Sequence, residues 1–171
     1  MADYSIRSCV AGDAATVAHH RTAMFVEMGV VPTDELARVL RDSSAIALAA
    51  ALRDQTYMGW LATAGNGAVI AGVGIHIKPQ LPRVTDDGSR IATTAVPLVV
   101  NVYTEPQWRQ RGIARTLMKT AMEWCAVRGF DRMVLHASEA GRPLYASLGF
   151  IATNEMRWAV PGRGAAIMSA P

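Results

Sequence analysis

The stretch WRQRGIARTLMKTAMEW, residues 108–124, contains the residues best suited to binding chemistry. It begins like a loop and continues as an amphipathic helix. Most helices begin with a Ser, Thr or Asp side chain that accepts hydrogen bonds from the first free backbone N–H groups. Gly112 and Ala114 stand at that place instead, and neither can cap the helix or obstruct a ligand. Free N–H groups at the positive end of a helix dipole bind anions such as phosphates. The stretch therefore predicts an anion site on the backbone of Arg111, Gly112, Ile113, Ala114 and Arg115.

On these residues alone a simpler interpretation stays open, in which Gly112 makes a tight turn and the neighbouring arginines are solvated. Other phosphate-binding patterns are absent from the sequence. There is no G-x-x-x-x-G-K-(S/T) loop, and the glycines of GVGIH, residues 72–76, are followed by a strand pattern rather than a helix. The choice between an anion site and a simple tight turn therefore depends on the sequence around the helix start.

Composition bounds the class of protein. The 171 residues fit one domain of ordinary size, and 51% hydrophobic with 18% charged residues is typical of a globular chain. The net charge of +3 suits an anionic small ligand, whereas 6% dispersed aromatic residues and the lack of a long Lys/Arg block argue against nucleic acid. Cys9 and Cys125 have no metal-ligand spacing, and no apolar run is long enough for a signal peptide or a membrane span. We expect a reduced, cytoplasmic protein with no membrane partner and no metal.

Periodicity and turn residues indicate which elements position this helix start. They are a strand at 4–10, a helix at 13–28 capped by Asp13, a helical stretch at 32–54 that allows an interruption near Ser43 and Ser44, two strands within 57–78 around the turn Gly65–Gly67, a strand at 97–104, a helix at 112–128, a strand at 132–137, a short helix at 142–148, and one or two strands up to Val160. Residues 79–96 form a long loop, and loops of that length are often functional.

This order of elements predicts a single-domain α/β fold over residues 4–160, followed by a loose tail at 161–171. The sheet is expected to be mixed and mostly antiparallel, with helices on both faces. Residues 97–137 form a central strand–helix–strand unit, which should be right-handed and parallel. The turn into its helix then lies at the carboxyl end of the strand, where such sheets bind ligands.

Two blocks of residues resemble a known family. Residues 109–114, RQRGIA, resemble the (Q/R)-x-x-G-x-(G/A) pyrophosphate loop of the GNAT superfamily of acetyl-CoA-dependent N-acetyltransferases. LYASLGF, residues 144–150, resembles that family's L-Y-x-x-L-G-F signature. The distance between the blocks and the order of elements fit as well. The resemblance implies a GNAT-like fold and acetyl-CoA as the acyl donor.

By this resemblance, the pyrophosphate of acetyl-CoA rests on the helix start, and its pantetheine arm pairs with the end of the strand at 97–104, which splays from the strand at 132–137. Ser138 stands where many members have an Asn that contacts pantetheine, and Gly141 stands where Ala is usual. The implied cofactor-binding residues are Val102, Tyr103, Thr104, Arg109, Gln110, Arg111, Gly112, Ile113, Ala114, Arg115 and Ser138.

The resemblance further implies that a primary amine attacks acetyl-CoA directly in a ternary complex. Tyr145 matches the family's residue that protonates or stabilises the departing thiolate, although a Tyr on a short helix can also be a packed ring with a solvated hydroxyl. Asn101 is an amide in the otherwise apolar strand LVVNVY, so it needs a polar partner. It shares a face with Tyr103. We predict that Tyr145 and Asn101 are catalytic, Asn101 by contacting substrate or a catalytic water.

The general base that takes the amine's proton is left open among Glu27, His76, Asn101, Glu105, His136 and Glu155. Glu27 and His76 are predicted to contact the acceptor, an amine-bearing small molecule or peptide, in a groove bordered by the first helices and the 79–96 loop. His19 and His20 have no third metal ligand at useful spacing. A CoA-binding regulatory protein without catalysis is the alternative function. A sheet edge near the C-terminus predicts a homodimer.

Overall fold

The structure is a computed structural model, and it describes residues 3–92, 94–153, 155–156 and 158. The tail predicted at 161–171 lies outside the described residues. In chain order the elements are β1 (Tyr4–Ser8), α1 (Ala14–Glu27), α2 (Asp34–Arg53), β2 (Tyr57–Ala64), β3 (Val69–Pro79), β4 (Ala95–Thr104), α3 (Ile113–Val127), β5 (Val134–Leu135) and α4 (Arg142–Ser147). Two short 3₁₀ turns, Ala11–Asp13 and Pro106–Trp108, precede α1 and α3.

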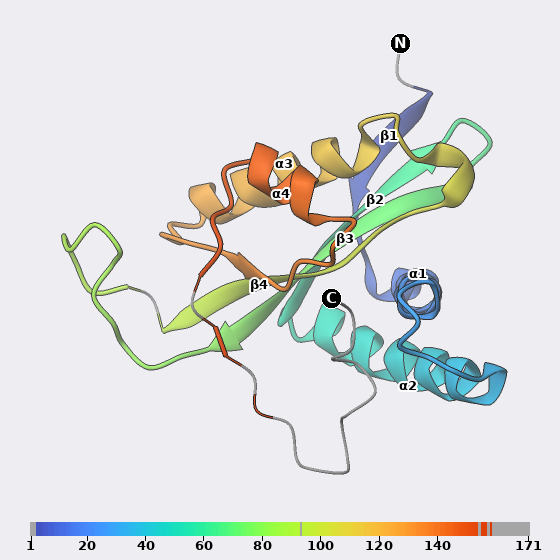
Figure 1. The fold of residues 1–171 in the computed structure, drawn as a ribbon, viewed down its shortest axis with the longest axis horizontal. Coiled ribbons are helices and arrows are strands. Elements are labelled where there is room, and N and C mark those ends of the chain that lie inside the picture. Colours follow the sequence, from blue (N-terminus) through green and yellow to red (C-terminus); the bar gives the residue numbers. More distant parts are fainter. Residues whose placement is uncertain (1–2, 93, 154, 157, 159–171) are drawn as a thin grey trace.

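The described strands form one mixed sheet with helices on both faces, as predicted. Its order is β1-β2-β3-β4-β5. Neighbouring strands are antiparallel except β4 and β5, which are parallel and joined by α3. Helices α1 and α2 lie against one face, and α3 and α4 lie on the other side of the sheet (Figure 1). The 97–137 unit is therefore the predicted strand–helix–strand unit.

The core is divided between the two faces of the sheet. On one face, the apolar stripe of α3 packs on β2 and β3; it includes Ile113, Leu117, Met118 and Ala121, all at most 2% exposed. This is the amphipathic stripe that the spacing of three and four residues predicts. On the other face, Val17 and Ala18 of α1 and Leu48 of α2 cover Leu61 and Tyr57 of β2. Because α3 is held by this burial, its N-terminal turn has a fixed place at the end of β4.

In the N-terminal half one local expectation is wrong, and one possibility that the sequence left open is excluded. Asp13 does not cap α1, because its carboxylate accepts hydrogen bonds from the Val10 N–H group and from the Arg7 guanidinium instead. Helix α2 is not interrupted near Ser43; it runs unbroken to Arg53 from a cap at Thr33, whose hydroxyl accepts from the Leu36 N–H group at 3.2 Å. The long contact of α2 with α1 outweighs the weak helix preference of two serines.

The C-terminal strands are shorter than expected. The strand predicted at 132–137 is reduced to Val134–Leu135, because β4 pairs with it only at Leu98 and Val99. The described residues after Gly149 belong to no strand, so the strands predicted up to Val160 are absent where the chain is described; Asn154, Arg157, Ala159 and Val160 lie outside the described residues.

Candidate active site

The start of α3 has no side-chain cap, as its sequence indicates. Gly112 occupies the N-cap position in the left-handed conformation, with φ 76°, and no side chain caps the helix. The first backbone bond of the helix runs from the Thr116 N–H group to the Gly112 carbonyl at 3.0 Å. Among the described residues, no acceptor is recorded for the backbone N–H groups of residues 110–115. A Cβ at Gly112 would meet nothing within 4 Å, so these donors face open space. Free backbone donors at a helix start are suited to binding an anion.

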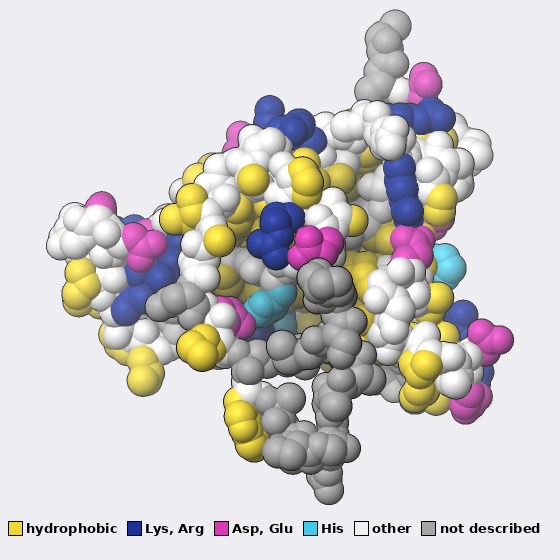
Figure 2. Space-filling view, in the orientation of Figure 1, with side chains coloured by type: hydrophobic (Ala, Val, Ile, Leu, Met, Phe, Trp, Pro, Cys, Tyr) yellow, Lys and Arg dark blue, Asp and Glu magenta, His cyan; other side chains and the backbone are white. Residues whose placement is uncertain are grey.

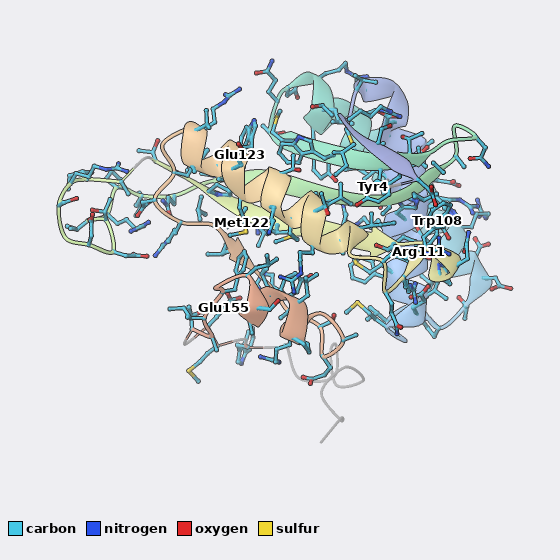
Figure 3. All side chains as sticks on the ribbon, turned by 90° about the horizontal axis from the view of Figure 1, so that it is seen from above. Tyr4, Trp108, Arg111, Met122, Glu123 and Glu155 are labelled. Carbon is cyan, nitrogen blue, oxygen red and sulfur yellow. The ribbon has the colours of Figure 1, made fainter. Side chains whose placement is uncertain are left out.

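The arginine side chains around this turn have partners within the protein. Arg109 binds both carboxylate oxygens of Glu27 at 2.7 and 2.8 Å, and its Nε donates to the Thr104 carbonyl at 2.9 Å. The Arg111 guanidinium lies 4.8 Å from the centre of the Trp108 ring, and Figure 3 shows both residues at the N-terminal end of α3. Arg115 donates to the Ser147 hydroxyl of α4 at 2.7 Å. The free donors at this helix start are therefore backbone groups, and the surrounding guanidinium groups are held by contacts within the protein.

Strands β4 and β5 separate beside this turn. Their pairing ends at Val99 and Leu135, so in the described structure the last five residues of β4, Val100–Thr104, have no β5 partner. The Thr104 hydroxyl is buried and has no hydrogen-bond partner among the described residues. The expected splay of the two strands is thus present, and it leaves unpaired polar groups along the strand end where the resemblance puts pantetheine.

A β-bulge in β4 places Asn101. The register between β3 and β4 shifts between Gly72 and Gly74, and Asn101 adopts φ 56°, a left-handed conformation that Asn tolerates better than most residues. Its Oδ1 accepts from Arg21 Nη1 at 2.7 Å, and its Nδ2 donates to the Tyr57 hydroxyl at 3.3 Å. Burial raises the pKa of Tyr57, so that hydroxyl stays protonated. The partner that a buried amide requires is thus supplied by Arg21 and Tyr57.

A second set of polar groups lies where β4 meets the end of α1. The Tyr103 hydroxyl donates to Glu27 at 3.2 Å, and burial, with Glu105 and Glu27 nearby, raises the pKa of Tyr103 to about 12. The His20 ring lies 5.1 Å from that of Tyr103, and its Nε2 is 3.5 Å from a Glu105 oxygen. Burial lowers the pKa of His20 to about 4, so this imidazole is neutral at pH 7. Sequence reasoning missed His20 and Arg21, whose partners are far away in the chain.

Tyr145 lies on α4, on the α3 side of the sheet. Its ring meets Phe150 edge to face at 6.0 Å, and no hydrogen-bond partner of its hydroxyl is recorded among the described residues. Burial raises the pKa of Tyr145. A Cβ on Gly141 would lie 2.7 Å from this ring, which explains why a glycine stands where Ala is usual. Ser138 Oγ accepts from the Gly141 N–H group at 3.2 Å, so this hydroxyl helps to cap the turn into α4.

The remaining base candidates lie elsewhere. His76 is exposed on β3, opposite Tyr57 and Leu98. His136 follows β5, and its Nδ1 lies 3.5 Å from Glu155, a residue labelled in Figure 3. Glu27 and Glu105 are therefore the two candidates that lie against Tyr103 at the end of β4.

The described residues 80–92 of the loop do not border Glu27, although the expected acceptor groove requires them to. The loop projects from the end of the sheet where β4 begins (Figure 1), whereas Glu27 lies where β4 ends. Arg83 binds Asp131 at 2.6 Å and Asp86 at 3.1 Å, and Arg90 donates to the Gly129 carbonyl at 3.3 Å. These bonds hold the loop on the turn between α3 and β5, so its described residues form no groove with Glu27.

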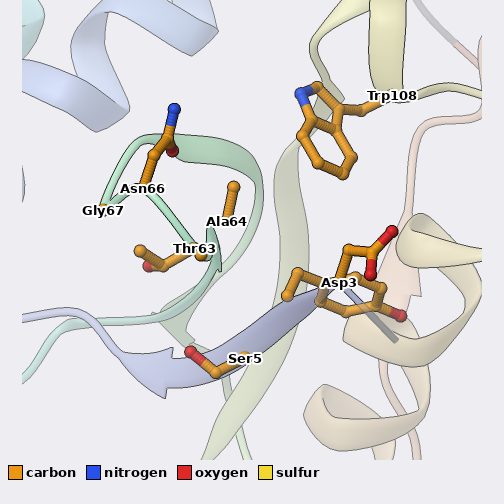
Figure 4. Close-up of a pocket in the computed structure, with 9 residues that line it drawn as sticks. Asp3, Ser5, Thr63, Ala64, Asn66, Gly67 and Trp108 are labelled. Atoms are coloured by element: carbon orange, nitrogen blue, oxygen red, sulfur yellow. The ribbon is translucent and has the colours of Figure 1, made fainter. Parts of the chain in front are cut away.

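A surface depression of about 750 Å³ lies outside the predicted site. It is bounded by the first residues of β1, the β2–β3 turn and Trp108 (Figure 4). None of the predicted site residues lines it. On the face shown in Figure 2, Lys and Arg side chains lie in separate groups, several of them beside acidic ones, and form no continuous basic stripe. In the described residues no helix is long and apolar enough to cross a membrane, and no three His, Cys, Asp or Glu side chains are arranged to hold a metal.

Comparison with known proteins defines the class. The chain matches the acetyltransferase (GNAT) family over residues 24–150. A GCN5-related N-acetyltransferase from Ralstonia eutropha JMP134 is 32% identical, with a TM-score of 0.80, and the match covers 93% of this chain and 99% of that one. A predicted acetyltransferase from Clostridium acetobutylicum, solved with acetyl-CoA, is 24% identical, with a TM-score of 0.77 and coverages of 92% and 96%. Aminoglycoside N-acetyltransferase AAC(6')-Iy, solved with CoA, is 18% identical, with a TM-score of 0.65 and coverages of 93% and 95%. No curated protein matches the sequence.

The chain therefore belongs to the GNAT family of acetyltransferases. It is an acetyl-CoA-dependent acyltransferase, as the resemblance of residues 109–114 and 144–150 implies.

Proposed function

We propose that the protein transfers the acetyl group of acetyl-CoA to a primary amine by direct attack within a ternary complex. The observation that carries this proposal is the uncapped start of α3, where free N–H groups surround Gly112. Backbone donors at a helix start bind a pyrophosphate without the help of side chains. We assign this role to Gln110, Arg111, Gly112, Ile113, Ala114 and Arg115, with Arg109 holding the turn through Glu27 and Thr104.

The unpaired end of β4 fits the pantetheine arm. Val102, Tyr103 and Thr104 have no β5 partner in the described structure, and the Thr104 hydroxyl is a buried group without a partner. An extended amide chain satisfies such groups as an added strand would. Ser138, already bonded to Gly141, has hydrogen-bonding capacity left for the same arm.

Acyl transfer needs one proton given to the departing sulfur and one taken from the amine. Tyr145 and Glu105 are suited to these two transfers. When the amine nitrogen bonds to the thioester carbon and the C–S bond breaks, the Tyr145 hydroxyl gives its proton to the departing sulfur. Its raised pKa keeps it protonated at neutral pH, and its hydroxyl has no recorded partner to compete. Glu105 directly follows the pantetheine strand and lies beside neutral His20, so we assign it as the acceptor of the amine's proton. Asn101 acts by holding the bulge.

A regulatory protein that only binds CoA would need the helix start but not the free hydroxyl of Tyr145. Tyr103 and Glu27 face the acceptor side in this proposal, and His76 is assigned a more distant contact with a larger acceptor. Cys9 and Cys125 are both free thiols, which supports the proposal of a reduced, cytoplasmic location. A homodimer through an exposed sheet edge is part of the same proposal.

The test is the affinity for acetyl-CoA of Gly112→Asp, measured by calorimetry. The new carboxylate would occupy the open space at the helix start and repel the pyrophosphate. We expect Kd to rise by at least about 100-fold, because charge-assisted hydrogen bonds contribute roughly 1.5–3 kcal/mol each.

Gly129→Asp is the matched control. Gly129 ends the same helix with the same φ of 76°, and a Cβ there also meets nothing within 4 Å. Both variants therefore introduce the same backbone strain and the same charge. If both weaken acetyl-CoA equally, or if Gly112→Asp binds it normally, the pyrophosphate does not lie at this helix start.

A further inference from the structure

Arg21 is a cation that has no Asp or Glu partner among the described residues. It lies on α1, is half-buried, and forms no ion pair with any of the 14 Asp and Glu residues, all of which lie in the part of the chain that the structure describes. Burial lowers the pKa of its guanidinium. A guanidinium withdrawn from water is normally paired with a carboxylate or another anion. Here no Asp or Glu side chain supplies that anion in the part of the chain that the structure describes.

The guanidinium of Arg21 is held in a fixed orientation. One nitrogen, Nη1, donates to Asn101 Oδ1 at 2.7 Å, and the Phe25 ring stacks 4.7 Å from the guanidinium carbon. Of its five N–H donors, the one to Asn101 is the only one with an acceptor recorded in the described residues. The remaining donors form the planar fork that binds a carboxylate with two bonds.

The position of Arg21 connects it to the acyl-transfer site. Asn101 is followed directly by Val102–Thr104, the strand end assigned to pantetheine, and Arg21 reaches it from the α1 face. On the same helix, His19 and His20 lie against Glu105, at 4.0 and 3.5 Å. A positive group and a negative group thus flank β4 on its α1 side.

We propose that the acceptor is an amine that also carries a carboxylate, an amino acid or a close relative, and that Arg21 binds this carboxylate. This inference rests on the proposed function, because it names the class of amine. The ammonium end is drawn to Glu105, which takes one of its protons before attack, and the carboxylate binds Arg21. The second proton, released as the amide forms, replaces the one that Tyr145 gives to the departing sulfur. A polycationic acceptor would place positive charge against Arg21, and this contact would not favour its binding.

The first experiment measures thiol release from acetyl-CoA with a panel of amino acids, each paired with its own carboxamide. The panel includes glycine, L-alanine, L-methionine, L-phenylalanine and L-glutamate. We expect kcat/KM for the best acid to exceed that for its carboxamide by about 10- to 100-fold, the range of a charge-assisted bidentate contact. Carboxamides that react as well as their acids would overturn the inference.

Variants separate binding by Arg21 from a purely structural role. Arg21→Gln should lower kcat/KM for the acid by about 10- to 100-fold, mostly because KM rises. It should change kcat/KM for the carboxamide by less than about threefold. Arg21→Lys should recover part of the loss. Arg53→Gln, at an exposed position of α2, is the control and should change neither. An equal loss on acid and carboxamide would show that Arg21 only supports the bulge.

If turnover is too slow to measure, calorimetry tests whether Arg21 binds the carboxylate of the acceptor. Wild-type protein saturated with CoA should bind at least one of these amino acids, with the binding lost in Arg21→Gln and kept in Arg53→Gln. Absence of binding by every acid in the panel contradicts the inference. The proposed function fails separately, if wild-type protein does not bind acetyl-CoA.

Discussion

Tyr145→Phe tests whether the phenol takes part in the chemistry. The change removes one oxygen and keeps the ring, so the edge-to-face contact with Phe150 and the fit against Gly141 are preserved. The hydroxyl has no recorded partner among the described residues, so no hydrogen bond inside the fold is lost. We therefore expect the free energy of unfolding to change by less than about 1 kcal/mol.

The catalytic effect should be much larger than the structural one. Positioned proton transfer typically contributes about 10²- to 10⁴-fold to the rate. A thiol with a pKa of about 8.5 is already a fair leaving group, which places the expected loss near the low end, at about 10²-fold in kcat, or about 2.7 kcal/mol of activation free energy. Because the interaction forms as the thiolate departs, kcat and kcat/KM should fall together and the Kd of acetyl-CoA should stay unchanged.

The assay is thiol release under single-turnover conditions, with acetyl-CoA affinity measured in parallel. Because burial raises the pKa of Tyr145, the acid stays protonated, and its titration should not reduce the rate between about pH 7 and pH 9. Tyr4→Phe is the control: Tyr4 lies on β1, and its hydroxyl donates to Thr116 at 3.4 Å. A loss of less than about threefold in Tyr145→Phe, with chemistry limiting turnover, would refute the acid role and leave a packed ring with a solvated hydroxyl.

Three further outcomes are expected. Gly74→Ala should destabilise the fold by about 3 kcal/mol or more, because its Cβ would overlap the buried Tyr57 hydroxyl, whereas Gly65→Ala, which meets nothing within 4 Å, should leave the melting temperature nearly unchanged. Asp13→Asn should lower the melting temperature by a few degrees at pH 7 and by less near pH 3. The bonds from Arg7 lower the pKa of Asp13, so this stabilisation is present above about pH 4 and is lost as pH falls below it; equal effects at both pH values would contradict the pairing. The homodimer predicts twice the monomer mass in light scattering at micromolar concentration, and a monomer mass would contradict it.

The features that could be predicted from the sequence are those encoded locally. The uncapped start of α3 is visible in Gly112 and Ala114 because a helix cap involves neighbouring residues. The buried stripe of the same helix follows from its spacing of three and four residues. The layered fold follows in turn, because each element shows its buried face in its own residues.

The features that could not be predicted depend on contacts that capping patterns and periodicity do not record. Asp13 follows the pattern of a helix cap, but Arg7 and the Val10 N–H group take its carboxylate. The strand at 132–137 has the composition of a full strand and keeps two residues, because its extent is set by where β4 bends away. Arg83 ties its loop to Asp131, and no periodicity reports such a pair. For the same reason the sequence indicates the uncapped helix start at Gly112 but does not define an acceptor groove.

The bulge at Asn101 in β4 changes which side chains meet at the site. Val99 packs with α3, so strict alternation along the strand would place Asn101 and Tyr103 on that same face. The bulge turns both of them to the α1 side, where Asn101 meets Arg21 and Tyr103 meets Glu27, while Val102 returns to the α3 side. The sequence does contain a signal for the bulge, since Asn accepts the left-handed conformation and Asn101 stands in an otherwise apolar strand. A polar residue of this kind in a buried strand therefore indicates a bulge as well as a partner, and the partner lies on the face that alternation excludes.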